Sequence, residues 1–373
     1  MTAADIRGQA LEVARGWSSP DAPQSWQLTA ALFRVIADHD DLHEALAALP
    51  GDRLPALLAS AAIRFLVHHD QPRPLAAYFP EPDRPQPVLD AGFAPAAAAF
   101  VSARLPEIAA VCARHRYQMN EVARCTQVTL GIAAATGPAA APVALVDLGT
   151  GAGLGLHIDR YTYQVNGTET GPPGASLTLS CAVRGSYLPP RPALPPIVSK
   201  TGIESDPVDL DDPAARAWLT ACAPPEAGAL TRLAAAIEVA RAHPALVAGG
   251  DVIEALPGVL ASLPAGLPVV VTDSYLAVFL PPDRRAMLTS ILAAAGRDRP
   301  VTWLSLDPLV PLGPAGRDSV QDLPLPGSLV ADYQRHGVFA VLGVRTYGHQ
   351  EETATVLARA HPSGQWVEWL APD

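Results

Sequence analysis

Residues Val143 to Tyr163 read VALVDLGTGAGLGLHIDRYTY, and this stretch determines the expected fold. The run from Val143 to Leu148 is apolar and rich in β-branched residues, which is typical of a buried parallel strand. Glycines then occupy alternate positions from Gly149 to Gly153, so the backbone can turn tightly and approach a ligand closely. A helix is expected from Leu154 to Tyr161, and its first N–H groups favour a polar or anionic ligand. The stretch therefore predicts a ligand site at the carboxyl end of a strand.

The spacing of the glycines excludes two common nucleotide-binding motifs. The third glycine of the dinucleotide fingerprint would fall at Leu154 or Leu156, and the P-loop lysine is missing because Lys200 is the only lysine. The pattern Asp147-x-Gly149-x-Gly151-x-Gly153 instead resembles the first motif of class I S-adenosylmethionine-dependent methyltransferases. That resemblance implies that the glycines face the methionine and ribose parts of the cofactor. The alternative is that they only allow close packing of a helix on the sheet.

Composition limits the class of ligand. The 373 residues carry 26 Lys and Arg against 37 Asp and Glu, a net charge of −11, with no basic cluster. A nucleic-acid substrate is therefore disfavoured, and a small molecule or a protein is the better candidate, of which we expect the small molecule. We expect a cytoplasmic protein that does not span a membrane, because no apolar run of about 18 residues and no signal-peptide pattern is present. The four scattered cysteines predict buried apolar side chains, and no metal site is expected. Nothing in the sequence indicates the oligomeric state.

Residues 1 to 135 are expected to form an N-terminal helical cap domain, because apolar residues recur there at steps of three and four. The pair His68-His69 could suggest a metal, but adjacent residues of a helix point about 100° apart, so a solvated helix end is favoured. A helix is also expected over Arg116 to Cys125. Its polar side chains, among them Gln118 and Glu121, either line the mouth of the ligand site or face solvent.

Residues 136 to 373 are expected to form a doubly wound, Rossmann-like α/β sheet of the methyltransferase type. Leu177 to Val183 is predicted as its second strand, and residues 185–230 as an insertion with a solvated acidic loop. In methyltransferases the second strand ends in an acidic residue that binds the ribose hydroxyls, whereas Arg184 follows here. A hairpin at Pro362-Ser363-Gly364 is expected at the sheet edge. Further strands are predicted at 245–248, 267–271, 301–306, 338–344, 353–360 and 365–370.

A second resemblance covers about two thirds of the chain. The block from Tyr117 to Cys125, the glycine loop and Asp159-Arg160-Tyr161 are similar to blocks of a bacterial family known as a domain of unknown function. That family is taken to contain a methyltransferase-like Rossmann domain, and it carries no assigned reaction. Gly155 replaces an asparagine of the family loop, and Ser363 stands where a histidine is usual. These departures imply that the substrate side of the site is altered.

Together the patterns predict an S-adenosylmethionine-dependent enzyme that acts on a small molecule, foremost by methyl transfer. The alternatives are cyclisation or aminobutyl transfer from the same cofactor, and a non-catalytic methyltransferase-like binding protein. A nicotinamide dehydrogenase is a weaker alternative because the dinucleotide fingerprint fails.

The candidate site residues fall into three groups. The residues expected near the reacting groups are Glu121, Asp273 and Tyr275. The cofactor-binding candidates are Asp147, Gly149, Thr150, Gly151, Gly153, Asp251, Val252 and Thr272. The substrate-binding candidates are Tyr117, Gln118, Asn120, Arg124, Arg160 and Tyr163. The role of Asp251 is open, because it can equally be the N-cap of the helix that follows it.

Overall fold

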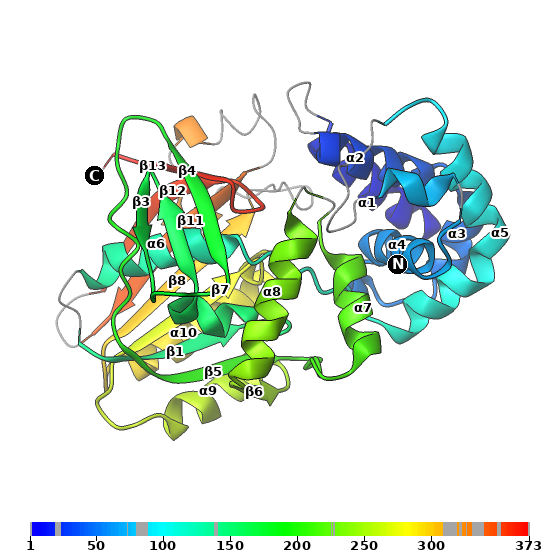
Figure 1. The fold of residues 1–373 in the computed structure, drawn as a ribbon. Helices are drawn as coiled ribbons and strands as arrows, with labels where there is room; N and C mark the ends of the chain where they lie inside the picture. The colour runs from blue at the N-terminus through cyan, green and yellow to red at the C-terminus, as the bar shows by residue number, and fades with distance from the viewer. Residues whose placement is uncertain are drawn as a thin grey trace. The chain divides into compact units, whose positions relative to one another are not determined.

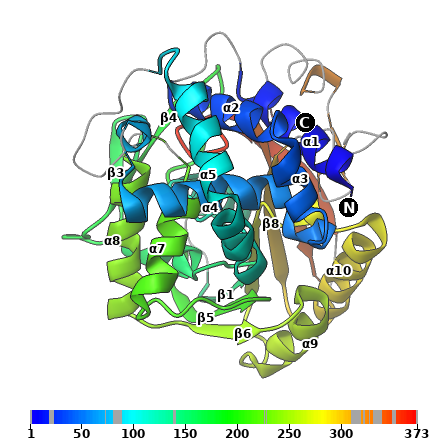
Figure 2. The same ribbon diagram turned by 90° about the vertical axis from the view of Figure 1, so that its right-hand side faces the viewer.

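The computed structural model describes residues 2–18, 24–72, 74–79, 89–137, 141–224, 226, 228–308, 319–320, 323–325, 327–329, 339–348 and 352–371. Contacts divide the chain into two units, drawn in Figure 1 and Figure 2. The helical unit comprises residues 1–120 and 210–234, and the sheet unit comprises residues 121–209 and 235–373. The sequence had placed this boundary near residue 135. Residues 210–234, part of the expected insertion, pack with the helical unit.

The helical unit consists of amphipathic helices, as the apolar periodicity predicted. Its elements are α1 (Ala3–Gly16), α2 (Gln24–Ala37), α3 (Asp40–Leu46), η1 (Gly51–Arg53), α4 (Pro55–Asp70), η2 (Leu75–Tyr78), α5 (Phe93–Arg114), α7 (Pro213–Cys222) and the start of α8 (Ala229–Ala242). Thr2 caps α1 and Asp212 caps α7, each through a side-chain oxygen that accepts a backbone N–H. The shared core contains apolar residues of α1 to α5 together with Trp218 and Cys222 of α7.

Among the described helices, α5 is long and apolar enough to cross a membrane by length and composition. This is weak evidence, because the core helix of a globular protein passes the same test. Phe93, Val101 and Ile108 of α5 are buried in the core of the helical unit. Pro106 lies inside the helix and the backbone at Arg104 is not helical, so the helix is kinked.

In the described residues of the sheet unit, eleven strands form one sheet in the order β3-β2-β4-β13-β12-β11-β8-β7-β1-β5-β6. Their bounds are β1 (Val143–Leu148), β2 (Thr162–Val165), β3 (Thr168–Thr170), β4 (Thr178–Arg184), β5 (Ile197–Glu204), β6 (Leu246–Gly249), β7 (Val269–Ser274), β8 (Val301–Pro308), β11 (Ala340–Tyr347), β12 (Thr353–Ala360) and β13 (Trp366–Trp369). The strands from β6 to β8 are parallel, and β11 and β12 are antiparallel to their neighbours. A separate pair joins β9 (Ser319–Val320) and β10 (Leu323–Pro324).

The strand order reverses at β1. The chain reaches β5 on one side of β1, continues outward to β6, and then crosses to β7 and β8 on the other side. Open α/β sheets bind their ligands at such a reversal, outside the carboxyl ends of the strands. The fold therefore directs attention to the loops that follow β1, β5 and β7.

Helices pack on both faces of the sheet. Val146 and Trp303 belong to a core shared with α9 (Val252–Ser262) and α10 (Pro282–Ala295). On the other face, Gly131 of α6 (Arg124–Thr136) lies against Leu304, the neighbour of Trp303 whose side chain points the opposite way. The prediction of an α/β protein with a large, mostly parallel sheet and helices is confirmed.

Several local predictions were wrong. The segment predicted as the second strand is β4, which lies between β2 and β13, and the neighbour of β1 is β5, inside the expected insertion. Residues 154–160 form a 3₁₀ segment, η3 (Leu154–Arg160), with a kink at His157 instead of an α-helix. The backbone from His115 to Glu121 is not helical, and α6 begins only at Arg124. The β12–β13 hairpin is confirmed, but it lies inside the sheet, because β13 also pairs with β4.

Candidate functional site

The glycine loop follows β1 with a backbone that only glycine adopts easily. Gly149, Gly151 and Gly153 have φ angles of 61°, 58° and 72°, all in the left-handed region. Between them, the methyl group of Thr150 fills the space above Gly202 of β5, where an added Cβ would lie 2.5 Å from it. The loop is therefore held against β5 and turns its backbone sharply at the carboxyl edge of the sheet.

Asp147, near the end of β1, is fixed by two hydroxyl groups. Thr150 Oγ1 donates to Asp147 Oδ2 at 2.6 Å, and Thr272 Oγ1 of β7 donates to Oδ1 at 2.7 Å. Burial raises the pKa of Asp147, and the two hydroxyls act in the opposite direction. A Cβ at Gly155 would lie 2.8 Å from Oδ2, so glycine at that position leaves room for the carboxyl group. The carboxyl group thus joins β1, β7 and the glycine loop.

Glu204 is the acidic residue at the end of β5 that the sequence analysis did not single out. Its Oε2 accepts a hydrogen bond from the Gly151 backbone N–H at 2.8 Å, and its Oε1 accepts from Ser205 Oγ and Asp206 N at 3.1 and 3.2 Å. The residue is only 9% exposed. The strand that pairs with β1 is β5, and not β4, which ends at Arg184. The neighbour of β1 therefore does end in an acidic residue, Glu204. The run before Glu204 contains Ser199, Lys200 and Thr201, so it gave no clear strand signal, and it lay inside the expected insertion.

The loop after β6 joins the same edge. The Gly250 N–H donates to the Glu204 carbonyl oxygen at 3.0 Å. Asp251 is the N-cap of α9, with Oδ1 accepting from the N–H groups of Ile253 and Glu254 at 2.9 and 3.3 Å, and it also forms an ion pair with Arg284. The N-cap prediction for Asp251 is confirmed. Val252, the first residue of α9, is buried.

Asp273 of β7 lies beneath this edge in a buried polar cluster. Its Oδ2 accepts from Trp303 Nε1 at 2.7 Å, and Ser305 Oγ lies 3.2 Å from its Oδ1 and 2.9 Å from Oδ2 of Asp307. Both carboxyl groups are 1% exposed. Burial, and next the neighbouring Asp307, raise the pKa of Asp273 well above its usual value. The hydrogen bonds of this cluster join the ends of β7 and β8.

Arg124 and Tyr275 form a stacked pair. The guanidinium carbon of Arg124 lies 3.6 Å from the centre of the Tyr275 ring, and Arg124 Nε donates to the Pro362 carbonyl oxygen at 2.6 Å. Tyr275 is half-buried and has a φ of 66°, which a residue other than glycine adopts at a cost. This constrained residue ends the β7 segment that also carries Thr272 and Asp273.

The remaining candidates lie in other surroundings. Glu121 is 6% exposed and accepts the Ala123 N–H at 3.0 Å, within its own turn. Tyr163 is 1% exposed and donates to the Ile158 carbonyl oxygen at 2.5 Å, whereas Arg160 is exposed at the end of η3. Three further candidates belong to the helical unit: Tyr117, Gln118 and Asn120. Within the sheet unit the cofactor candidates thus lie at the carboxyl edge of β1, β5, β6 and β7, and the substrate candidate Arg124 stacks on Tyr275 directly after β7.

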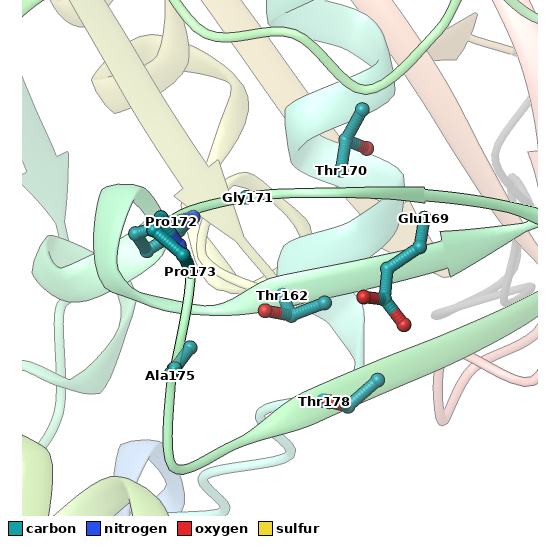
Figure 3. Close-up of a pocket in the computed structure, with 9 residues that line it drawn as sticks. Thr162, Glu169, Thr170, Gly171, Pro172, Pro173, Ala175 and Thr178 are labelled. Carbon is teal, nitrogen blue, oxygen red and sulfur yellow. The ribbon is translucent and has the colours of Figure 1, made fainter.

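A hollow of about 350 Å³ lies elsewhere on the sheet unit (Figure 3). It is lined by the turn between β3 and β4, which includes Gly171 and Gly174, and by Thr162, Glu169 and Thr178. Glu169 is the only ionisable side chain in this lining, and no residue of the glycine loop contributes to it. Because one carboxylate offers little chemistry, we place the candidate site at the glycine loop.

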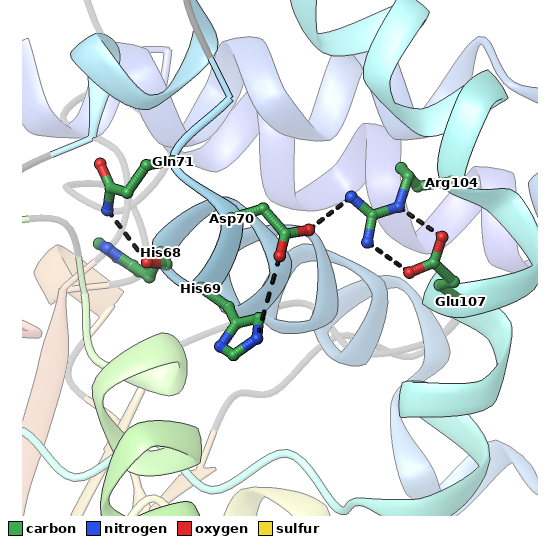
Figure 4. A network of polar contacts seen from close by, with 6 residues as sticks. All are labelled: His68, His69, Asp70, Gln71, Arg104 and Glu107. Atoms are coloured by element: carbon green, nitrogen blue, oxygen red, sulfur yellow. Dashed lines mark hydrogen bonds and ion pairs between the residues drawn. The ribbon is translucent and has the colours of Figure 1, made fainter.

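The paired histidines His68 and His69 lie at the end of α4 (Figure 4). His69 is largely exposed and lies 4.0 Å from an oxygen of Asp70, which pairs with Arg104 of α5, and Arg104 also pairs with Glu107. No group of three or more His, Cys, Asp or Glu in the described part of the chain could hold a metal ion. The four cysteines are free and buried, as predicted.

The fold and this edge define an α/β protein with a cluster of polar residues where the strand order reverses. A model of the family described as an uncharacterized protein conserved in bacteria (DUF2332) matches residues 14–369. The chain belongs to this bacterial family. No curated protein matches the chain, and no solved structure matches it.

Proposed function

We propose that this protein is a cytoplasmic S-adenosylmethionine-dependent enzyme that transfers the methyl group to a small molecule. Neither a nucleic acid nor a membrane is its substrate. The observation that carries the proposal is the link from Gly151 to Glu204, which places an acidic residue of the second parallel strand beside the glycine loop. In the methyltransferase pattern these two features bind the cofactor together.

Three parts of the edge would each hold one part of the cofactor. Gly149, Gly151 and Gly153 have no side chains, which allows close approach of the methionine part. Glu204 would bind the ribose hydroxyls, because a carboxylate has about four acceptor positions and its three bonds within the protein leave capacity. Asp251 would accept a hydrogen bond from the adenine amino group beside the start of α9.

The chemistry needed from the protein is mainly alignment. When bound, the cofactor supplies an electrophilic methyl group on a sulfonium leaving group. The chain has to hold the acceptor atom in line with it, which lowers the barrier through orientation. Tyr275 is the most accessible of the three residues expected near the reacting groups, and its stacking on Arg124 and left-handed backbone fix its ring. Asp273 supports this segment from below, since its Oδ1 accepts the Ala277 N–H at 3.4 Å.

Calorimetric titration with S-adenosylmethionine and with its demethylated product tests the proposal. We expect micromolar binding to the wild-type protein and loss of binding in Gly151→Arg, whose side chain would occupy the loop. Glu204→Ala should weaken binding about 10- to 100-fold, because hydrogen bonds to a charged group are lost. Glu254→Ala, which removes an exposed carboxylate from the first turn of α9, is the matched control and should bind normally. Absence of binding to folded wild-type protein would refute the proposal.

A further inference from the structure

Arg64 of α4 is a buried cation for which the described residues provide no counterion. The residue is 5% exposed, and its Nε and Nη2 atoms are buried without a hydrogen-bond partner. Within the described residues no carboxylate forms an ion pair with it. Buried arginines are ordinarily paired, because removing a guanidinium from water without a partner is strongly unfavourable.

Among the described residues, no negatively charged group acts on Arg64. The ionisable groups that act on it are the phenol of Tyr117 and the thiol of Cys222, and burial lowers the pKa of Arg64 more than these two groups raise it. Burial also raises the pKa of Cys222 to about 12, so this thiol is neutral at pH 7. All three residues belong to the helical unit.

The segment that carries Tyr117 is attached to α7 by aromatic contacts. The Trp218 indole N–H donates to the Arg116 carbonyl oxygen at 2.8 Å, and the His115 ring stacks on Trp218 with ring centres 4.3 Å apart. Trp218 and Cys222 are four residues apart on α7 and therefore share one side of that helix. The two ionisable groups that act on Arg64 thus belong to α7 and to a non-helical segment that is attached to it.

Arg53 of the same unit has an unpartnered Nε as well, but its Nη atoms have a structural role. Its Nη atoms donate to the carbonyl oxygens of Cys112, Ala113 and His115, at the C-terminal end of α5. These carbonyls have no partner in their own helix, so the arginine caps them. Arg64 makes no such contact in the described part of the chain, and it is more deeply buried than Arg53.

We propose that Arg64 forms a binding site for one oxyanion, a carboxylate or a phosphate monoester carried by a small molecule. The planar guanidinium can donate two parallel N–H bonds to two oxygens of such a group. This site lies entirely in the helical unit, and it does not depend on the proposed function of the sheet unit.

The test is thermal unfolding of the full chain at pH 7 in sodium phosphate, sodium acetate or sodium chloride at equal ionic strength. Phosphate or acetate should raise the Tm of the wild-type protein above its value in chloride, by roughly 3 °C at ten times the Kd. The anion that raises the Tm distinguishes a phosphate site from a carboxylate site. In Arg64→Met the anion concentration for a half-maximal shift should rise at least about tenfold.

The unfolding temperature in chloride gives a second readout. Arg64→Met should unfold at the same or a higher temperature than the wild type, because it removes an unpaired buried charge. Arg53→Met is the matched control: its Tm should fall while its response to anions stays. Two results would overturn the proposal. One is a wild-type Tm that phosphate and acetate leave at its chloride value, and the other is an Arg64→Met variant that keeps the full response.

Discussion

The backbone N–H of Gly151 lies 2.8 Å from Oε2 of Glu204, so the glycine loop after β1 is hydrogen-bonded to the end of β5. The methyl group of Thr150 packs over Gly202 of the same strand, which adds an apolar contact to this polar one. Two independent contacts therefore fix the loop, and the conformation expected for ligand binding is formed in advance. Preformed sites bind more tightly because less ordering occurs on association.

Replacing Thr272 by valine should destabilise the sheet unit by about 1.5–3 kcal/mol, because the buried Asp147 carboxyl group loses a hydrogen bond. The pKa of Asp147 should rise further, since the Thr272 hydroxyl lowers it. Urea unfolding measures the free energy. Thr272→Ser keeps the hydroxyl group and should lose clearly less unfolding free energy than Thr272→Val. Equal losses in the two variants would contradict the assigned role of this hydrogen bond.

Gly155→Ala should lower the free energy of unfolding by about 1–3 kcal/mol. The new Cβ would lie 2.8 Å from Asp147 Oδ2 and would force a shift in a packed region. Gly258→Ala in α9 is the matched control. No atom lies within 4 Å of an added Cβ there, so the variant should gain about 0.5–1 kcal/mol from helix propensity. If Gly155→Ala were as stable in urea as the wild type, the Asp147 carboxyl group would not be held in place by close packing against residue 155.

The Asp273–Asp307 pair predicts that raising the pH destabilises the protein. A carboxyl group whose pKa is raised by folding binds more protons in the native state, so stability is full below its ordinary pKa of 3.8 and falls as pH rises through the folded pKa. Asp273→Asn imitates the protonated carboxyl group and should flatten this part of the profile. Urea unfolding from pH 4 to pH 8 measures the slope; an unchanged slope in the variant would assign it to other groups.

His157 predicts the opposite dependence in acid. Burial is the main cause that lowers its pKa to about 4, so the native state keeps the ring neutral while the unfolded chain protonates near 6.5. Stability should fall on the order of 3 kcal/mol as the pH drops from 6.5 to 4. His157→Gln cannot protonate and should lose most of this dependence. His361, with a pKa lowered to about 3, should keep a similar dependence in that variant.

The sequence predicted the local features of the site well and its neighbour relationships poorly. β1 and the glycine loop were predictable, because an apolar run followed by alternating glycines determines local backbone geometry. The neighbour of β1 was not, because β5 contains Ser199, Lys200 and Thr201 and does not resemble a buried strand. Lys200 is tolerated there because its ammonium group pairs with Asp159 at 2.5 Å.

Contacts made by the folded chain also explain why the helix predicted from Arg116 to Cys125 was wrong before Arg124. The polar side chains at helical spacing indicated a helix, but Glu121 instead accepts a hydrogen bond from the Ala123 N–H in a turn before α6. Short polar segments give weak helix signals, and contacts made by the folded chain decide their backbone. Strand order was likewise decided by packing that no local pattern contains.

The position of β1 between β5 and β7 has a consequence for synthesis on the ribosome. Both partners of this apolar strand are made after it, and β2 to β4 are made in between and pair elsewhere. A nascent chain that ends before residue 197 therefore presents β1 with two unpaired edges, the arrangement that favours association with other chains. Until β5 emerges, protection of this strand has to come from the ribosome, a chaperone or transient contacts of the nascent chain.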